Sequence, residues 1–496
     1  MSLYDSIQKT LSKKNINAVI GDIYDLQEVW KQWYRGNVND FHKYNAIVNG
    51  KSKQFERKTL NSAKTFSEEI TKLLWTEKTE IHLDSDDKTD ELWKVLDSKK
   101  NSFSVNFPVF IEKVMALGTG ATIEYYDEDN EVVIDYIDGT NIIPYKYTNS
   151  YIYGLVTVSQ TVEMKDEKKI YITLLTFHEY VGGYYNKKHE LYRSMNENEL
   201  GDQISFKTYY PNVKEEESIE TDIPRFQIYR PNLANNYDID SPMGISIFAN
   251  IIDILKSIDI KFTSFSNEFE LGKKRILVDP SAMKAQTQSD SDGNVHLVQY
   301  FDETDTTFVG INGMEDQPVK EIDFSLRVQE HIDAINADIN YASINLGLGS
   351  NYFRFDGSGL KTATEVISEN NKAFRTKTHH DIIINDGVYD LVKAICSMAG
   401  IQNNDINIVS DDSIIEDKNT EKMQAQQEVQ QGLMSKKAYL MDINGMTEKE
   451  AEDMLLEIEN EKKSNQEAFG FPVEETPEEN EEKVDNKEKD NKEEEE

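Results

Sequence analysis

Cysteine and long apolar runs are scarce in this sequence. Cys396 is the only cysteine among 496 residues, which excludes a disulfide framework and any zinc site built from several cysteines. No run of about 18 apolar residues occurs, and the first residues contain no apolar segment of the signal-peptide type. We therefore expect a soluble chain that originates in a reducing cytoplasm and contacts no membrane.

Positive charge is also in short supply. The chain has 54 Lys and Arg against 91 Asp and Glu, a formal net charge of −37. This excess excludes tight binding of nucleic acid through a general phosphate-neutralising surface. Residues 471–496 hold 13 acidic residues and 4 Lys, so −9 belongs to this segment and −28 to the rest. We expect a disordered acidic tail over residues 466–496, which either only solvates the protein or docks to a partner.

Catalytic and metal-binding motifs are missing as well. The sequence contains no HExxH, no GxxxxGK[ST] and no GxSxG, and neither Gly118-Thr-Gly120 nor Gly347-Leu-Gly349 extends to a dinucleotide fingerprint. Asp290-Ser-Asp292-Gly293 begins like a calcium loop but lacks the closing Glu. Cys396 lies on the apolar stripe of a predicted helix, where a buried, inert thiol is expected. We predict no catalytic residue, no metal, no cofactor and no enzymatic activity.

The first 240 residues combine helices with short strands. Apolar residues at helical spacing predict helices from about residue 23 to Gly36, from 60 to 75, and from Asn106-Phe-Pro108 to Gly118. Between residues 121 and 229 the spacing changes to two, and turn residues separate aromatic and β-branched runs, as is typical of β-hairpins. The fold class is therefore α+β, mainly helical over the whole chain.

Two long apolar stripes follow. The first consists of Phe248, Ile251, Leu255, Ile258, Phe262, Phe265 and Phe269, and the second of Val328, Ile332, Ile335, Ile339, Ala342 and Leu346. Their three-four spacing predicts amphipathic helices over residues 241–272 and 323–346, on either side of a strand-like insertion over 273–322. Two interpretations stay open: an ordinary antiparallel pair inside one core, or a helical hairpin that carries a small β module at its far end.

A glycine-rich loop follows the second stripe. Four glycines between Gly347 and Gly359 end the helix, and a capping box of Thr362 and Glu365 starts a further helix that continues to Ala399. A polar connection over residues 403–417 then leads to short C-terminal helices.

Eight segments in a fixed order carry a family resemblance. They are residues 30–36, 58–64, 106–120, 241–248, 268–275, 347–365, 432–435 and 448–461. Each segment alone is weakly specific, whereas the ordered set is strong and spans nearly all of residues 20–461. The chain resembles the portal (head-to-tail connector) proteins of tailed bacteriophages that infect Gram-positive hosts.

This resemblance implies a ring of usually about twelve copies at a unique capsid vertex. It implies a wing over residues 1–240 with a wing helix over 361–402, and a stem of two helices over 241–272 and 323–346. It further implies a β-rich clip over 273–322, a tunnel loop over 347–360 and a helical crown over 403–465. Genomic DNA would be packaged through the channel and later ejected from the virion, after assembly in the host cytoplasm.

The resemblance also implies partners. The terminase large subunit supplies the energy of packaging, a head-completion adaptor protein docks later, and major capsid and scaffolding proteins surround the ring. Double-stranded DNA would pass only transiently. The alternative is a coiled-coil scaffold or capsid assembly protein without a channel.

Three sets of residues are predicted to act in such a ring. The DNA-contacting tunnel loop contains Ser350, Asn351, Tyr352, Phe353, Arg354, Phe355 and Asp356. The basic stem–clip junction contains Lys273, Lys274 and Arg275. Packing between stems of neighbouring subunits is assigned to Phe248, Ile251, Leu255, Ile258, Phe262, Phe265, Phe269, Val328, Ile332, Ile335 and Ile339.

The predicted mechanism is electrostatic. Rings of carboxylates leave moving DNA without fixed phosphate partners, which favours sliding over binding. The exceptions are Lys273, Lys274, Arg275 and Arg354, which either touch the DNA backbone or pair with acids of the next subunit.

Overall fold

The computed structural model describes most of the chain. The described residues are 2–19, 21–48, 50–272, 275–278, 285–289, 295–299, 308–310, 319–322, 325–356, 363–402, 405–410, 425–443, 446, 449, 451–452 and 454–458. The chain forms two compact units, Met1–Ile415 and Glu416–Glu496.

Within the described residues, five helices precede the large sheet. They are α1 (Leu3–Lys13), α2 (Ile23–Tyr34), α3 (Ser62–Leu74), α4 (Asp86–Leu96) and α5 (Phe103–Leu117). The predicted helices correspond to α2, α3 and α5. Helices α1 and α4 were not predicted, because each buries a single i,i+4 pair of apolar residues, Ile7 with Leu11 and Leu92 with Leu96.

Helix α5 begins three residues before the predicted start at Asn106. Asp97 accepts hydrogen bonds from the backbone N–H of Ser104 at 2.8 Å and from its hydroxyl at 2.6 Å. These bonds satisfy a donor of the first turn and fix the start of the helix ahead of Pro108. The helix then contributes Phe103, Phe107 and Phe110 to an aromatic core.

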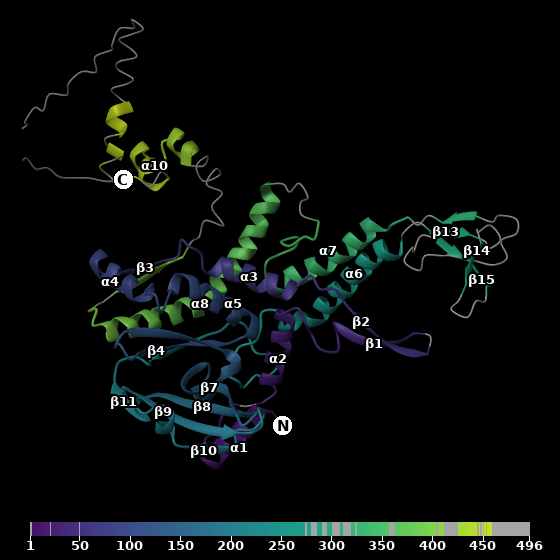
Figure 1. The fold of residues 1–496 in the computed structure, drawn as a ribbon. Coiled ribbons are helices and arrows are strands. Elements are labelled where there is room, and N and C mark those ends of the chain that lie inside the picture. The colour runs from purple at the N-terminus through teal and green to yellow at the C-terminus, as the bar shows by residue number, and fades with distance from the viewer. Residues whose placement is uncertain are drawn as a thin grey trace, which may run out of the picture. The chain divides into compact units, whose positions relative to one another are not determined.

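The strands between residues 120 and 229 form two antiparallel sheets, which confirms the predicted hairpins. The strands are β4 (Gly120–Tyr126), β5 (Val132–Asp138), β6 (Ile142–Thr148), β7 (Tyr151–Lys165), β8 (Lys168–Val181), β9 (Tyr184–Ser194), β10 (Asp202–Ile204), β11 (Glu216–Glu220) and β12 (Phe226–Tyr229). The larger sheet has the order β10-β9-β8-β7-β6, with β11 also paired to β9, and the smaller one has the order β12-β4-β5 (Figure 1).

Helix α8 (Ala363–Ala399) confirms the predicted helix up to residue 399. Beyond it the predicted polar connection is wrong, because β18 (Ile406–Val409) pairs antiparallel with β3 (Glu80–Leu83). This strand belongs to the first unit, so the predicted crown boundary at residue 403 is too early. Tyr229 ties α8 to the small sheet, since its hydroxyl donates to the Gly387 carbonyl at 3.1 Å.

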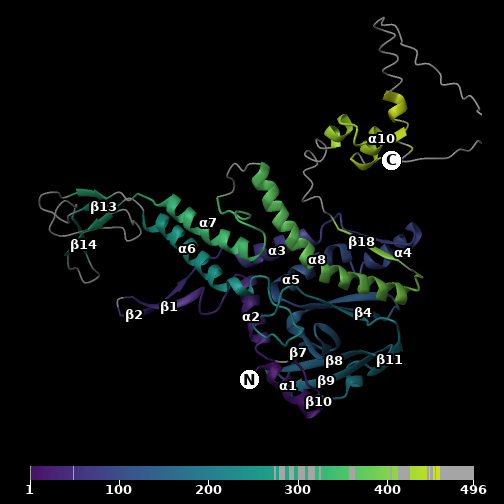
Figure 2. The ribbon, with the colours of Figure 1, turned by 180° about the vertical axis from the view of Figure 1, so that it is seen from behind.

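Helices α6 (Ile252–Leu271) and α7 (Val328–Asn345) run side by side (Figures 1 and 2). Between them lie β13 (Arg275–Val278), β14 (Ala285–Ser289), β15 (Val295–Gln299), β16 (Phe308–Gly310) and β17 (Val319–Ile322). One sheet has the order β16-β13-β17 and the other pairs β14 with β15. The predicted helical hairpin with a β insertion is thus present.

A separate two-stranded sheet is formed by β1 (Lys43–Val48) and β2 (Lys51–Glu56). It connects α2 with α3 and extends from the body in the same direction as α6 and α7 (Figures 1 and 2).

The second unit is helical where it is described. Residues 425–430 are helical, and α10 (Lys436–Asp442) is capped by Ser435, whose hydroxyl accepts from the Ala438 N–H at 3.0 Å. The predicted disordered tail over 466–496 lies outside the described residues. Among the helices that are described, none combines the length and apolar character needed to cross a bilayer.

Candidate functional site

Close backbone contact between Gly118 and Gly244 attaches the start of the helical hairpin to the rest of the first unit. A Cβ on Gly118 would lie 2.6 Å from the Gly244 carbonyl oxygen, and one on Gly244 would lie 2.3 Å from the Gly118 oxygen. The Gly244 N–H donates to the Thr119 hydroxyl at 3.0 Å, and the Ile247 N–H to the Met115 carbonyl at 3.0 Å. Only residues without a side chain permit this approach, which fixes the chain just before α6.

The seam between α6 and α7 is apolar and lies within one subunit. Ile258, Ile335 and Ile339 form its buried centre, and Phe262 and Phe265 pack against them. The helical hairpin therefore has a small core of its own between α6 and α7.

The prediction that the stripe packs between subunits is wrong for its most buried members. Phe248, Ile251, Leu255, Ile258 and Ile335 are at most 2% exposed in the isolated chain, so no surface is left for a neighbour. Phe248 and Ile251 also precede the α-helix, which starts at Ile252. Ile339 is buried, Phe262, Phe265, Val328 and Ile332 are half-buried, and Phe269 is exposed.

Ion pairs reinforce the same seam. Lys261 Nζ lies 2.7 Å from Asp338 Oδ2 and donates to the Ala334 carbonyl at 3.2 Å. At the far end, Arg327 binds Glu268 with two guanidinium nitrogens, at 3.1 and 2.8 Å. Hydrogen bonds from Arg327 lower the pKa of Glu268 to about 2. Charged groups thus fasten both the middle and the end of the hairpin.

Outward-facing apolar residues were missed by the sequence analysis. Ile260 on α6 and Tyr341 and Ile344 on α7 are 45%, 59% and 52% exposed. Each lies roughly 140–200° around its helix from a seam residue at about 100° per residue. This offset could have predicted their exposure from the sequence. Large apolar side chains that lie outside the buried face of a long helix usually contact a partner elsewhere.

The loop after α7 is held against its own subunit by aromatic residues. The Tyr352 hydroxyl donates to Glu69 at 2.8 Å, and Phe353 lies 4.9 Å from Phe66 between ring centroids. Burial, followed by the contact with Glu69, raises the pKa of Tyr352 above its usual range. Phe355 joins the rings at the α6–α7 seam.

Side-chain amides of α7 fix the loop backbone. Asn340 Oδ1 accepts from the Asn351 N–H and Asn336 Oδ1 from the Phe355 N–H, both at 2.7 Å. Arg354 and Asp356 are exposed and form a two-point ion pair at 3.0 and 3.1 Å. DNA contact by this loop stays a prediction, and only its exposed residues present side chains fully to solvent.

The structure describes only one residue of the predicted basic stem–clip junction. Lys273 and Lys274 lie outside the described residues, and Arg275 is the first residue of β13. The loop residues 357–360 and the capping residue Thr362 also lie outside them.

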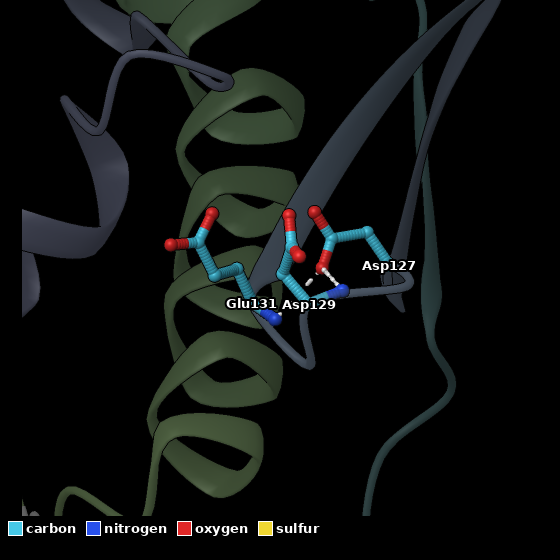
Figure 3. Close-up of side chains that lie close together, drawn as sticks. All are labelled: Asp127, Asp129 and Glu131. Atoms are coloured by element: carbon cyan, nitrogen blue, oxygen red, sulfur yellow. Dashed lines mark hydrogen bonds between the residues drawn. The ribbon is translucent and has the colours of Figure 1, made fainter.

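An acidic cluster on the β4–β5 turn resembles a cation site. Asp127, Asp129 and Glu131 present ligand oxygens within 4.8 Å of one another (Figure 3). Lys100 pairs with all three carboxylates, with Asp129 at 3.0 Å and Glu131 at 2.7 Å. Lys100 therefore occupies the space between the carboxylates and offsets one of their three charges, and the geometry gives no reason to add a metal.

An open cavity of about 940 Å³ borders α1 and the large sheet. Its charges pair with one another: Lys14 with Glu190, Lys146 with Glu179 at 2.6 Å and Lys188 with Glu216 at 2.7 Å. Six charged side chains of this lining are therefore already paired within the subunit.

A family model described as "Phage portal protein, SPP1 Gp6-like" matches residues 18–464. The chain belongs to this family. The predicted resemblance to phage portal proteins is thereby confirmed over nearly the whole length, helical hairpin and loop included. Portal proteins are structural proteins of the phage particle.

Solved structures give weaker similarities to this portal protein. A chain from "Virion of native gene transfer agent (GTA) particle" has 9% identity and a TM-score of 0.40, covering 86% of this chain and 95% of its own. A chain from "Neck of native GTA particle computed with C12 symmetry" has 11% identity and a TM-score of 0.36, with coverages of 77% and 88%. No curated protein gives a significant match.

Proposed function

We propose that this portal protein forms a ring-shaped channel at a unique capsid vertex, through which double-stranded DNA is packaged and later ejected. In this proposal α6 and α7 are the stem, the β13–β17 insertion is the clip, and the unit Glu416–Glu496 contains the crown. The wing comprises residues 1–240, α8 and also β18. The observation that carries the proposal is the acidic helical hairpin α6–α7 in a chain of the portal family.

The charge of the hairpin suits a conduit. Together α6 and α7 contain seven carboxylates and two lysines, a net charge of −5. Asp253, Glu270, Glu330 and Asp333 are exposed. About twelve copies around one axis would repeat this charge about twelvefold, so DNA would meet repulsion rather than fixed phosphate contacts.

The outward apolar residues suit contacts between neighbouring stems. Ile260, Tyr341 and Ile344 have no buried environment in one subunit, and a ring would give them one. They replace the buried stripe residues as the proposed inter-subunit contacts, together with the exposed Phe269.

The loop and the clip would contact moving partners. Residues Ser350–Asp356 would line the narrowest passage, with Arg354 and Asp356 toward the DNA, and Lys273, Lys274 and Arg275 would provide a cationic ring at the stem–clip junction. The clip would bind the terminase large subunit and afterwards the head-completion adaptor, while major capsid and scaffolding proteins hold the wing in the virion.

Negative-stain electron microscopy of the purified chain tests the proposal. We expect closed rings of about twelve subunits with a central hole. Tyr341→Glu with Ile344→Glu should reduce rings to monomers, because two charges would be buried in each contact. Val162→Glu with Met164→Glu, which changes two similarly exposed residues of β7, is the matched control. Filaments or dimers from the unchanged chain would support the alternative, a coiled-coil scaffold without a channel.

A further inference from the structure

The β1–β2 hairpin is largely exposed to solvent. Residues 51–54 of β2 are all exposed, and Ile47 on β1 is 81% exposed. An isolated sheet of two strands is only marginally stable in water. Because β1 and β2 pair only with each other among the described strands, both outer edges of the sheet are open. Such edges usually have a partner or a protecting device.

The foot of the hairpin, residues 42–44 and 55–60, is nevertheless firmly attached to the stem helix α6, whereas residues 46–53 form the distal half. The Val38 N–H donates to His42 Nδ1 at 2.8 Å, so His42 Nε2 carries the proton and donates to Asp259 Oδ2 at 3.0 Å. Asp259 Oδ1 accepts from the Leu60 N–H at 3.0 Å. One buried carboxylate therefore holds the chain both before β1 and after β2.

Aromatic and cationic groups then stiffen the first part of the hairpin. Tyr44 and Phe55 are cross-strand neighbours that stack at 5.7 Å, and the Arg57 guanidinium lies 4.0 Å from the Tyr44 ring centroid. The hairpin is thus anchored and stiffened at its foot. Among the described residues of its distal half, Lys53 Nζ lies 5.6 Å from the Phe55 ring centroid and no ion pair occurs.

The hairpin is basic in a very acidic protein, and Lys51 and Lys53 lie in its distal half. Residues 43–58 contain Lys43, Lys51, Lys53, Arg57 and Lys58 against Glu56, a net charge of +4 in a chain of −37. Lys58 pairs with Glu270 at 3.2 Å. Within the described part of the chain, no carboxylate forms an ion pair with Lys43, Lys51 or Lys53. The positive charge is therefore available to something outside the subunit.

We propose that the β1–β2 hairpin docks onto a second copy of this chain, with Lys51 and Lys53 pairing with carboxylates of that neighbour. This inference rests on the proposed ring, which places an acidic neighbour beside every subunit. The hairpin extends from the body on the same side as its own α6–α7 pair (Figures 1 and 2). In a ring, we expect it to meet the acidic α6–α7 pair of the next subunit. The hairpin would act as a strap between neighbours.

A polypeptide partner fits this surface better than DNA. The hairpin offers open strand edges and the apolar side chain of Ile47 together with its lysines, and strand edges and apolar groups bind protein rather than phosphate. The remaining surface of the protein is strongly acidic and would repel DNA from this region, whereas the same acidity attracts the hairpin of another copy.

Carbodiimide cross-linking of assembled rings tests the proposal, because it joins lysines directly to carboxylates that touch them. Rings would be reassembled from equal amounts of ¹⁴N-labelled and ¹⁵N-labelled full-length chains, and mixed-isotope peptides would identify links between subunits. We expect mixed links from Lys51 or Lys53 to Asp or Glu of the other copy. Lys51→Glu with Lys53→Glu should abolish these links and raise the subunit concentration needed for ring formation about tenfold.

The β7–β8 turn provides the matched control. Lys168→Glu with Lys169→Glu reverses two exposed lysines at the end of another hairpin and should leave the ring-forming concentration unchanged. Rings that form normally in the Lys51/Lys53 variant, with only single-isotope links in the unchanged protein, would overturn the docking but leave the proposed channel standing. Absence of mixed links, together with protection of Lys51 and Lys53 from an amine-reactive reagent only after DNA is added, would show the hairpin to be a DNA contact instead. Absence of rings from the unchanged chain would overturn the proposed function itself.

Discussion

The first unit carries two hairpins that extend in the same direction and differ in almost everything else. The α6–α7 hairpin buries an isoleucine seam and closes it with ion pairs such as Lys261–Asp338. The β1–β2 hairpin leaves most of its residues in water and its lysines without a described carboxylate partner. The helical hairpin is complete as a monomer, whereas the β-hairpin is only attached at its foot.

This difference indicates which residues can contribute to the free energy of subunit association. A seam that is already buried in the monomer cannot bury further surface against a neighbour, so association depends on the groups that remain exposed. Those groups are the off-seam apolar residues of α6 and α7 and the basic end of the β-hairpin.

The largest effect is expected at the seam. Ile335→Ala removes a fully buried side chain and should destabilise the chain by about 2–5 kcal/mol, measured by thermal or urea unfolding. Ile344→Ala on the exposed face of the same helix should cost less than about 1 kcal/mol in the monomer. Equal losses from the two variants would contradict the assignment of the seam to one subunit.

The next effect joins the two hairpins. Asp259→Ala leaves His42 Nε2–H and the Leu60 N–H without their acceptor, and should cost about 2–4 kcal/mol. Amide hydrogen exchange should also accelerate in residues 43–60 more than elsewhere. Asp253→Ala, which removes an exposed carboxylate from the same helix, should change neither quantity, and a hairpin that exchanges as before in Asp259→Ala would show that its attachment lies elsewhere.

A smaller, pH-dependent effect is expected at the far end of the helical hairpin. Glu268 has a folded-state pKa of about 2, below its usual 4.5. Its contribution is therefore complete above about pH 4.5 and is lost as the pH falls toward 2. Arg327→Met should lower the thermal midpoint at pH 7, and the gap to the unchanged protein should narrow below pH 4.5. A gap that stays constant down to pH 2 would argue against the pairing.

The smallest effect concerns the monomer stability of the β-hairpin. Lys51→Glu with Lys53→Glu should change the free energy of unfolding of the monomer by less than about 0.5 kcal/mol, because exposed charges contribute little. The measurement is urea unfolding below the concentration at which rings form. A large loss would mean that contacts within the subunit, such as that of Lys53 with the Phe55 ring, contribute more than exposed charges usually do.

The sequence was sufficient for elements with strong periodicity. The three-four spacing of the stripes located α6 and α7, and alternation located the hairpins between β4 and β12. It failed where tertiary contacts decide local structure. Asp97 starts α5 early, and β18 forms only because β3 offers an edge from more than 300 residues earlier.

The candidate site was harder to predict, because periodicity shows which side chains are buried but not by what. Ile258 on α6 and Ile335 on α7 were correctly predicted to lie on the apolar faces of their helices. These faces pack against each other within one subunit rather than against a neighbouring subunit. Tyr352 and Phe353 suggested a projecting loop, and contacts with Glu69 and Phe66 hold them to the body. Those partners lie far away in the sequence and leave no local pattern.

The pairing of β3 with β18 also means that β3 stays without this partner strand until about 320 further residues have been synthesised. The Asp405 N–H donates to Asp84 Oδ1 at 2.7 Å across a separation of 321 residues. A ribosome adds about 5–20 residues per second, so β3 waits roughly 15–65 s for its partner strand. During that interval a nascent strand edge stays open to other chains, and slower translation would lengthen this exposure before the subunit can close.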